Sequence, residues 1–255
     1  MRWDDFRRVG SPAISGPAAR GLSLGQSSFP PALGIALSRA GVHVDGSADL
    51  RDLERLVRER KPDFLICTAA ALGADPETAI EDLLPTRSKG VVPTILVSEE
   101  RTLDENACRT TGFSEVLGWG QDALGYFLMI RATLRRKRPH VMTEVLEFGK
   151  LSLDQEKFVV SFEERRAPLK MLEFCVLGAM LDAPRMVWNK IFLNRVVFGP
   201  VDVKPGRQFD TYMSVVRRRI RSRIGVDPIV AEHGLGYALS PTVLGATDIL
   251  AGHGD

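Results

Sequence analysis

Residues 209 to 220 read FDTYMSVVRRRI, and this stretch decides the fold of the second half of the chain. Apolar side chains recur in it at intervals of four, three and four positions, and the stripe continues four positions further on. That spacing puts them on one face of a helix and predicts packing against a core. The apolar stripe consists of Phe209, Met213, Val216, Ile220 and Ile224. The opposite face carries Thr211, Ser214 and several arginines, so we expect an amphipathic helix with a basic outer face.

Arginine is concentrated around this helix. Residues 207–223 contain six arginines against one acid, Asp210. The six are Arg207, Arg217, Arg218, Arg219, Arg221 and Arg223. A second basic run, RATLRRKR at 131–138, has five cations and no acid. One basic run alone is more often a solvated face than a binding site. Charge of a single sign on one helix nevertheless favours a phosphate-bearing partner.

The segments around the basic helix have the order of a winged helix-turn-helix, an α+β domain. In chain order we expect short strands over 146–153 and 158–162, a turn at 163–166, helices over 169–181 and 190–197, a loop over 198–206, the basic helix, and a β-hairpin of 229–231 and 237–239 turning at 233–236. The helix over 169–181 is apolar on nearly every side, which is typical of a central helix. Asn189 can cap the following helix, and two glycines and two prolines mark the loop.

Strands and helices alternate in the first half of the chain. We expect strands over 22–24, 42–44, 63–67, 92–97 and 115–117, each followed by a helix, over 31–40, 48–60, 76–84, 103–110 and 121–134. Five successive βα units predict an α/β receiver-like (βα)5 fold, a doubly wound parallel sheet with helices on both faces. The preceding residues are rich in Gly, Pro, Ser and Ala, so we expect a flexible tail over 1–20.

Both halves together resemble the OmpR/PhoB class of bacterial response regulators. Besides the central apolar helix, four segments carry the resemblance: LSLD at 151–154, VWNKIFLNRVVFG at 187–199, FDTYMSVVRRRI at 209–220 and GLGYALS at 234–240. The resemblance implies a receiver-like domain over 21–135, a linker over 136–145, a winged-helix DNA-binding domain over 146–241 and a tail over 242–255. It also implies a transcriptional regulator in the cytoplasm, with double-stranded DNA as its partner and no enzyme activity.

The first half resembles a receiver domain that lacks its phosphotransfer residues. A receiver needs an aspartate at the end of the third strand, two acids after the first strand that hold Mg²⁺, and a lysine on the fifth strand. Here Thr68 stands at the phosphoacceptor position, and Gly25 and Gln26 follow the first strand. Trp119 replaces the lysine, and Ser98 keeps a phosphate-side hydroxyl. Without the carboxylates neither a metal site nor an aspartyl phosphate can form, which predicts independence from phosphorylation.

Trp119 leaves three roles open. Its large aromatic side chain can fill the vacated acidic pocket, or pack under the neighbouring helices at the edge of the sheet. The third role is contact with a small molecule or a protein partner, since an aromatic body has replaced a point charge at this position.

The resemblance also implies which residues meet DNA. In this family the basic helix enters the major groove and the hairpin reaches the neighbouring minor groove. The residues at these positions are Arg207, Thr211, Tyr212, Ser214, Arg217, Arg218, Arg221 and His233. We expect the arginines to contact phosphate or guanine, and Thr211, Tyr212 and Ser214 to face outward and read base edges. His233 stands at the hairpin tip, where the family usually has arginine.

Two protein contacts follow from the same resemblance. The loop with Asp202 and Lys204 lies where the family touches RNA polymerase, at its sigma or alpha subunit; a simple connector is the alternative. The helix over 121–134 contributes to a symmetric dimer in the family. Its aromatic residues Tyr126 and Phe127, with Met129, favour a homodimer through residues 101–134 over a purely internal role.

Other classes of function find little support. The chain has no run of about 18 apolar residues and no secretory signal at its start. Its three cysteines and four histidines are widely spaced, so we expect neither disulfides nor a metal site. No catalytic set or phosphate-binding glycine loop is visible, and we expect no cofactor. The main alternative is a protein-interaction module whose basic half binds nucleic acid non-specifically.

Overall fold

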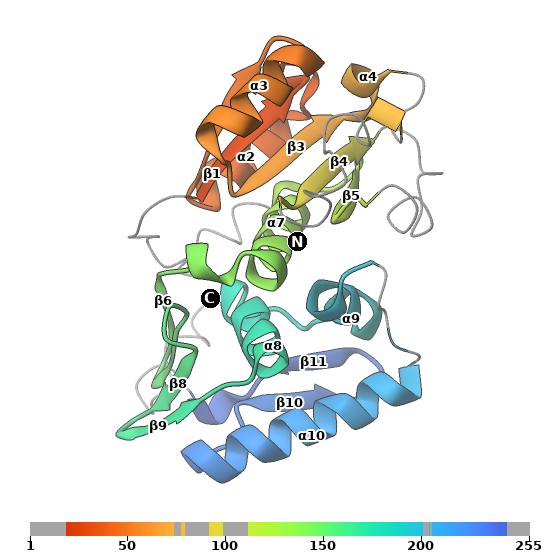
Figure 1. Cartoon of the computed structure of the whole chain (residues 1–255). Coiled ribbons are helices and arrows are strands. Elements are labelled where there is room, and N and C mark those ends of the chain that lie inside the picture. The colour runs from red at the N-terminus through yellow and green to blue at the C-terminus, as the bar shows by residue number, and fades with distance from the viewer. Residues whose placement is uncertain are drawn as a thin grey trace, which may run out of the picture. The chain divides into compact units, whose positions relative to one another are not determined.

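The computed structural model describes residues 19–73, 78–79, 92–98, 112–200, 204 and 206–243. The helix expected over 103–110 lies outside the described residues, and so does the one over 76–84 except for Thr78 and Ala79, which are helical. The chain divides into two compact units (Figure 1). We call them the first unit, mainly residues 17–141, and the second unit, mainly residues 142–198 and 203–255.

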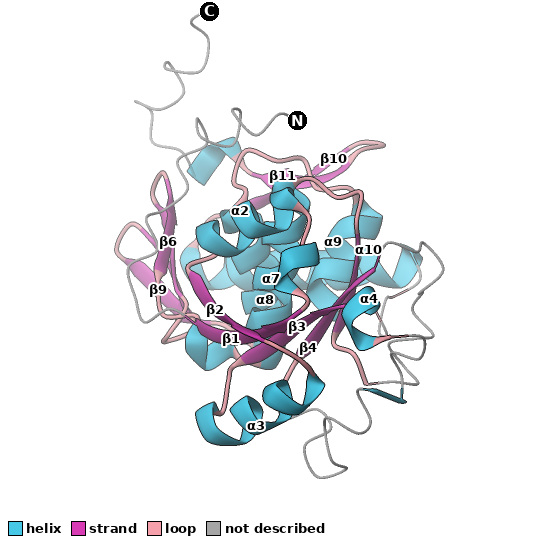
Figure 2. Ribbon diagram, turned by 90° about the horizontal axis from the view of Figure 1, so that it is seen from above, coloured by secondary structure: helices cyan, strands magenta, loops and turns pink. Residues whose placement is uncertain are grey.

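A five-stranded parallel sheet forms the centre of the first unit. Its strands are β1 (Ala19–Leu24), β2 (Val42–Ser47), β3 (Phe64–Thr68), β4 (Thr94–Ser98) and β5 (Glu115–Gly118), in the order β2-β1-β3-β4-β5. The helices are α2 (Pro31–Arg39), α3 (Leu50–Arg60), α4 (Ala69–Leu72) and α7 (Ala123–Lys137). Figure 2 shows α2 and α7 on one face of the sheet and α3 on the other. The doubly wound parallel sheet predicted from the sequence is confirmed.

Helix spacing and strand burial explain this arrangement. The apolar face of α3 buries Leu53 and Leu56 in one cluster with Leu22 of β1. Asp49 caps α3 by accepting a hydrogen bond from the Asp52 N–H at 2.8 Å. Strands β3 and β4 are buried along their whole length, as inner strands of a parallel sheet are. The carboxyl ends of β1, β3 and β4 meet at one edge, which is where doubly wound sheets bind their ligands.

The second unit is a winged helix-turn-helix preceded by a small antiparallel sheet. The sheet consists of β6 (Val145–Phe148), β7 (Leu151–Asp154), β8 (Val159–Phe162) and β9 (Arg165–Pro168), paired in chain order. Helices α8 (Met171–Asp182), α9 (Lys190–Phe198) and α10 (Gly206–Ile224) follow, and then the hairpin of β10 (Ile229–Glu232) and β11 (Gly236–Leu239). Every residue from Glu173 to Asp182 is buried, so the central position predicted for this apolar helix is confirmed.

Two expectations about the antiparallel sheet are wrong. The single strand expected over 146–153 is the hairpin of β6 and β7, which turns at Gly149 and Lys150. The turn expected at 163–166 is shorter, because its last two residues pair with β8 as part of β9. Strands of four residues have too few alternating positions to mark their ends in a sequence.

The expected tails are in part ordered. Arg20 belongs to β1 rather than to a tail. At the other end, Val243 is buried, and its carbonyl accepts a hydrogen bond from the Lys150 N–H at 2.8 Å. Residues 1–18 and 244–255 lie outside the described residues. Separately, none of the helices that the structure describes is long and apolar enough to cross a membrane.

Candidate nucleic-acid interface

The apolar stripe of α10 is part of the core of the second unit. Its members Phe209, Met213, Val216, Ile220 and Ile224 are each at most 1% exposed. The Phe209 ring packs edge-on against Phe198 of α9 and Tyr237 of β11, with ring centres 6.3 and 6.1 Å away. The predicted stripe is confirmed, and it fixes which side of α10 faces away from the core.

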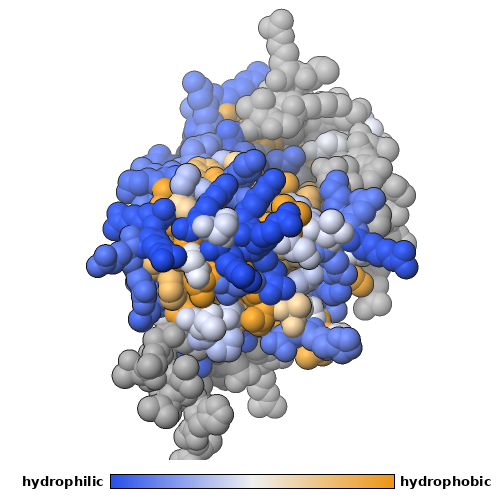
Figure 3. All heavy atoms as spheres, turned by 90° about the horizontal axis from the view of Figure 1, so that it is seen from below, coloured by the Kyte–Doolittle hydropathy of each residue, from blue (hydrophilic) through white to orange (hydrophobic). Residues whose placement is uncertain are grey.

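Five exposed polar side chains lie in one line on the opposite side of α10. They are Arg207, Thr211, Ser214, Arg218 and Arg221, at intervals of four, three, four and three positions. We call this line the basic stripe. None of its arginines has an acidic partner among the residues that the structure describes. Figure 3 looks onto the side of the second unit that carries α10, where hydrophilic side chains gather around a few apolar ones.

A shallow groove of about 600 Å³ runs along the second half of the basic stripe. Ser214, Arg218 and Arg221 line it, together with residues of the turn that follows α10. The hydroxyls of Thr211 and Ser214 donate to backbone carbonyls four positions earlier, at 3.0 and 2.9 Å. Their oxygens can still accept a hydrogen bond. The stripe thus combines fixed positive charge with groups suited to a base edge.

The other three arginines of α10 hold the helix in place. Arg217 donates two hydrogen bonds, from Nε and Nη2, to Asp227 Oδ2, at 3.1 and 2.9 Å. Arg219 and Arg223 pair with Glu173 of α8, at 3.7 and 3.0 Å. Since Glu173 is only 1% exposed, its carboxylate anchors α10 to the start of α8. Among the described residues, the six arginines therefore divide into three without an acidic partner and three that form ion pairs with residues of the second unit.

Two predicted DNA contacts are partly buried. Arg217 pairs with Asp227 while its side chain stays 28% exposed and lines the groove beside Arg218, so its contact with DNA stays a prediction. Tyr212 does not face outward, because its ring centre lies 5.0 Å from that of Phe198 and its hydroxyl is buried. Tyr212 follows Phe209 by three positions, which places its ring on the apolar side of the helix.

Asp210 joins three parts of the second unit. Its carboxylate accepts hydrogen bonds from Lys190 Nζ of α9 at 3.0 Å and from the Tyr237 hydroxyl of β11 at 2.8 Å. These two hydrogen bonds hold the pKa of Asp210 below its usual value. Asn189 caps α9 as predicted, since its Oδ1 accepts from the Ile191 N–H at 2.8 Å. The start of α9, the first half of α10 and the hairpin therefore meet at Asp210.

The structure describes one of the two residues expected to touch RNA polymerase. Asp202 lies outside the described residues. Lys204 has its backbone held by Asn194, which accepts from the Lys204 N–H at 3.1 Å and donates to its carbonyl at 2.7 Å. His233, the predicted DNA contact in the hairpin, is exposed at the tip between β10 and β11.

Sequence reasoning missed the residues that position the basic stripe, namely Glu173, Asp227 and Asn194. A local signal existed for Glu173, because it stands three positions after Lys170 and accepts the Lys170 N–H at 3.0 Å, as in a capping box. Its ion pair with Arg223 spans 50 positions, and no periodicity in the sequence connects the two.

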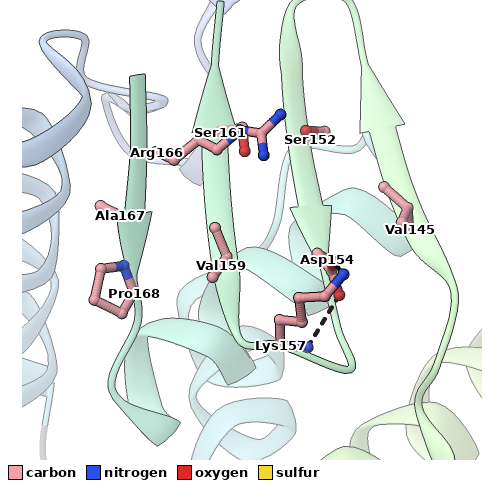
Figure 4. A pocket seen from close by; sticks show the side chains of 9 residues that line it. All are labelled: Val145, Ser152, Asp154, Lys157, Val159, Ser161, Arg166, Ala167 and Pro168. Atoms are coloured by element: carbon pink, nitrogen blue, oxygen red, sulfur yellow. Dashed lines mark hydrogen bonds and ion pairs between the residues drawn. The ribbon is translucent and has the colours of Figure 1, made fainter. Parts of the chain in front are cut away.

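A second hollow lies on the outer face of the sheet β6–β9 and measures about 490 Å³. Figure 4 shows Arg166, Ser161 and Ser152 side by side on neighbouring strands. Nearby, Asp154 and Lys157 form an ion pair of 2.8 Å. Because one of its two cations is already paired, this hollow lacks the concentrated charge of the basic stripe, and we assign it no part in nucleic-acid binding.

In the first unit, the residues at the carboxyl edge of the sheet are closely packed. Thr68 is 2% exposed, and its Oγ1 accepts a hydrogen bond from the Ala71 N–H at 3.3 Å. Gly25 has a φ of 77°, and a Cβ built on it would lie 2.3 Å from Thr68 Oγ1. Gln26 turns toward Ser23, 3.4 Å from its hydroxyl. Only glycine fits at position 25 beside Thr68. Among the described residues no group of three or more His, Cys, Asp or Glu side chains is placed to hold a metal ion.

Three other residues at this edge have clear positions. Ser98 is buried at the end of β4. Trp119 is 40% exposed, and its backbone N–H donates to the Ser98 carbonyl at 3.0 Å. Of the three roles left open for it, contact with a small molecule or a partner agrees best with this exposure. The Cys67 thiol is buried, which raises its pKa to about 12 and makes it an unreactive core side chain.

The second basic run is mostly internal. Arg131 and Arg135 of α7 are 2% and 1% exposed. Arg136 lies 3.3 Å from the buried carboxylate of Glu115 in β5. The pairing of Arg136 with Glu115 gives one of these cations a structural role within the first unit.

The aromatic side chains of α7 are also buried. Tyr126, Phe127 and Met129 are 0%, 4% and 2% exposed, and the Tyr126 hydroxyl donates to the Gly118 carbonyl at 2.8 Å. The homodimer through residues 101–134 stays a prediction.

Relatives in the curated proteins match the chain across both units. The phosphate regulon transcriptional regulatory protein PhoB of Rhizobium meliloti is 24% identical over 204 residues, which cover 80% of this chain and 90% of PhoB. The sensory transduction protein RegX3 of Mycobacterium bovis is 26% identical over 209 residues, 78% of this chain and 87% of RegX3. The chain is thus similar, over both of its units, to response regulators of the OmpR/PhoB type. The names of both relatives describe regulatory or signal-transduction proteins.

Solved structures of response regulators are similar at lower identity. The OmpR/PhoB homologue DrrB of Thermotoga maritima is 18% identical, covers 88% of this chain and 99% of its own, and gives a TM-score of 0.37. A redox sensor of the streptococci, described as evolved from two-component response regulators, is 16% identical with the same coverage and a TM-score of 0.40. No protein-family model matches the chain.

Proposed function

We propose that this chain is a sequence-specific DNA-binding transcriptional regulator of the OmpR/PhoB type that acts as a dimer and without aspartyl phosphorylation. The observation that carries the proposal is the basic stripe, which exposes three arginines and two hydroxyl residues along one side of α10. From its first to its last residue the stripe spans about 21 Å at the rise of an α-helix. A helix of that length fits into the major groove of B-DNA.

Within the stripe, different residues suit different contacts. Arg218 and Arg221 border the groove along the second half of α10, and we assign them to phosphates. Thr211 and Ser214 lie nearer the start of the helix, and we assign them to base edges. Arg207, in the first turn of α10, suits either phosphate or guanine.

The internal ion pairs support the same proposal. Recognition of bases needs a helix held at a fixed angle to the rest of its domain. Glu173 anchors the last turns of α10 through Arg219 and Arg223, and Asp210 connects its first half to Lys190 and Tyr237. Selection of bound duplexes from a random pool tests the proposal. We expect one enriched motif, and a pool that stays random after several rounds would contradict it.

We take 21–135 and 146–241 as the two domains, with a linker over 136–145, and the cytoplasm as the place of action. Lys204 and Asp202 are the proposed contacts to RNA polymerase, with the backbone of Lys204 fixed by Asn194.

Phosphorylation independence rests on the carboxyl edge of the parallel sheet. Thr68 stands in place of the nucleophile, and Gly25 and Gln26 follow β1 where the metal-binding acids would stand. We expect incubation with acetyl phosphate and Mg²⁺ to leave the mass of the intact chain unchanged and its DNA affinity unaltered. A family member that has the aspartate serves as the positive control. A hydroxylamine-sensitive phosphoryl group on the first unit would refute this prediction.

Dimerisation is expected on DNA. In this family the receiver domains pair two-fold while the effector domains lie head to tail, so we expect two half-sites in direct repeat. A duplex with both half-sites should bind two copies, about 100-fold more tightly than a duplex with one half-site scrambled, because the second contact is intramolecular. Mass photometry counts the copies. One copy on the intact duplex at saturation would be incompatible with a dimer.

A further inference from the structure

The tip of the hairpin presents an exposed leucine two positions after His233. Leu235 is 62% exposed in the turn between β10 and β11, and its N–H donates to the Glu232 carbonyl at 3.0 Å. The turn also holds His233 and Gly234, and it contains neither lysine nor arginine. The His233 ring can donate a hydrogen bond to DNA. Leu235 adds an exposed apolar side chain to the same tip.

A rigid base supports this leucine. The backbones of Trp188 and Tyr237 exchange hydrogen bonds of 2.7 and 3.0 Å in an antiparallel bridge. Trp188 is fully buried. Between the bridge and the tip, Gly236 has a φ of 142°, and a Cβ built on it would lie 2.0 Å from the Trp188 carbonyl oxygen. Only glycine fits there, so the tip is seated directly against the segment before α9.

The same base is connected to α10. Tyr237 follows Leu235 by two positions, and its hydroxyl donates to Asp210 of α10 at 2.8 Å. Asp210 in turn pairs with Lys190 at the start of α9. The beginning of α9, the hairpin and the first half of α10 are therefore held together, and Leu235 is positioned by the same framework that positions the basic stripe.

We propose that Leu235 enters the minor groove of the bound DNA as an apolar wedge and bends the duplex. The minor groove is about 6 Å wide, which admits a single leucine side chain. Leucine is among the side chains that proteins insert between base steps, which unstacks them and kinks DNA by roughly 20–90°. Flexible pyrimidine–purine steps are the cheapest to kink, so we expect one at the position that Leu235 contacts. This inference rests on the proposed DNA-binding function.

A bend measurement on the full-length chain tests the wedge. The probe is a duplex of about 30 base pairs that carries the motif enriched by the wild-type chain, with a fluorescent donor and acceptor at its two ends. We expect wild-type binding to shorten the distance between the dyes. Leu235→Ala should straighten the duplex and weaken binding about tenfold, because the apolar contact is lost. Val145→Ala is the control, since it trims an aliphatic side chain of β6 that is 47% exposed.

A charged variant separates the wedge from a general contact with the groove. Leu235→Arg should also remove the bend, while it increases the salt dependence of binding by about one counterion. If wild type binds the duplex without bending it, or if Leu235→Ala keeps both bend and affinity, the wedge is refuted and the proposed function stands. Loss of transcription in Leu235→Ala with unchanged binding and bend would instead assign the tip to a protein partner. If the wild-type chain binds no duplex, the proposed function and the wedge both fail.

Discussion

Replacing Arg218 and Arg221 together by alanine is expected to weaken binding to every DNA duplex by about 100-fold. Each guanidinium that reaches a phosphate makes hydrogen bonds to a charged group, and a loss of about tenfold for each is at the lower end of what such bonds contribute. The slope of log affinity against log salt should fall by about two, since each lost phosphate contact removes about 0.9 from it. Because phosphates carry no sequence information, the preference between duplexes should change little.

Arginines elsewhere on the surface provide the control for this double variant. Arg55 and Arg58 are exposed on α3 of the first unit and pair with neighbouring acids. Replacing both by alanine removes the same net charge, and we expect affinity and salt slope to stay close to wild type. Fluorescence anisotropy at four salt concentrations measures both quantities. If the Arg218 and Arg221 variant behaved like the control, the basic stripe would be a solvated face.

Glu173→Ala is expected to destabilise the second unit by about 2 kcal/mol. Removing one partner of a buried ion pair leaves uncompensated charge and usually costs about 3–5 kcal/mol. Here Arg219 and Arg223 keep side-chain exposures of 48% and 34%, so water can solvate them and the cost is smaller. The Lys170 N–H also loses its acceptor. Urea denaturation followed by Trp188 emission, with Trp3 and Trp119 replaced by phenylalanine, reports the stability of this unit.

DNA binding should respond to the same change, since α10 loses its anchor to α8. We expect Glu173→Gln to retain the hydrogen bond to the Lys170 N–H and to show a smaller effect on stability than Glu173→Ala. Lys157→Ala is the control, because its ion pair with Asp154 is exposed and such pairs contribute about 0–1 kcal/mol. Equal stability of Glu173→Ala and Lys157→Ala would mean that the buried carboxylate does not position the helix.

Periodicity made the large features predictable. The spacing of Phe209, Met213 and Val216 determined the inner face of α10, and the alternation of short apolar runs with helices determined the parallel sheet. These are local signals that repeat along the chain. The four short strands β6–β9 were only partly resolved, because their turns at Gly149 and at Glu163 interrupt the alternation after four residues.

The partners of the arginines could not be predicted, because they are set by tertiary structure. The sequence does not show that Arg223 pairs with Glu173, which lies 50 positions away. It also does not show that Asp227, which follows the turn after α10, pairs with Arg217. The same holds for Tyr212, whose orientation depends on the gap beside Phe198. In the first unit, the sequence shows that the acidic residues of a phosphotransfer site are replaced. It does not show how closely Gly25 of one loop approaches Thr68 at the end of β3, because that distance is set by the tertiary structure.

Competition between two duplexes tests the central claim most directly. One duplex carries the motif enriched by the wild-type chain, and the other has the same length and composition with the motif scrambled. The account predicts that the full-length chain prefers the first by about 1,000-fold or more near physiological salt, and that affinity for both duplexes falls as salt rises. Equal affinity for the two duplexes would contradict sequence-specific regulation and favour an interaction module that binds nucleic acid through charge alone.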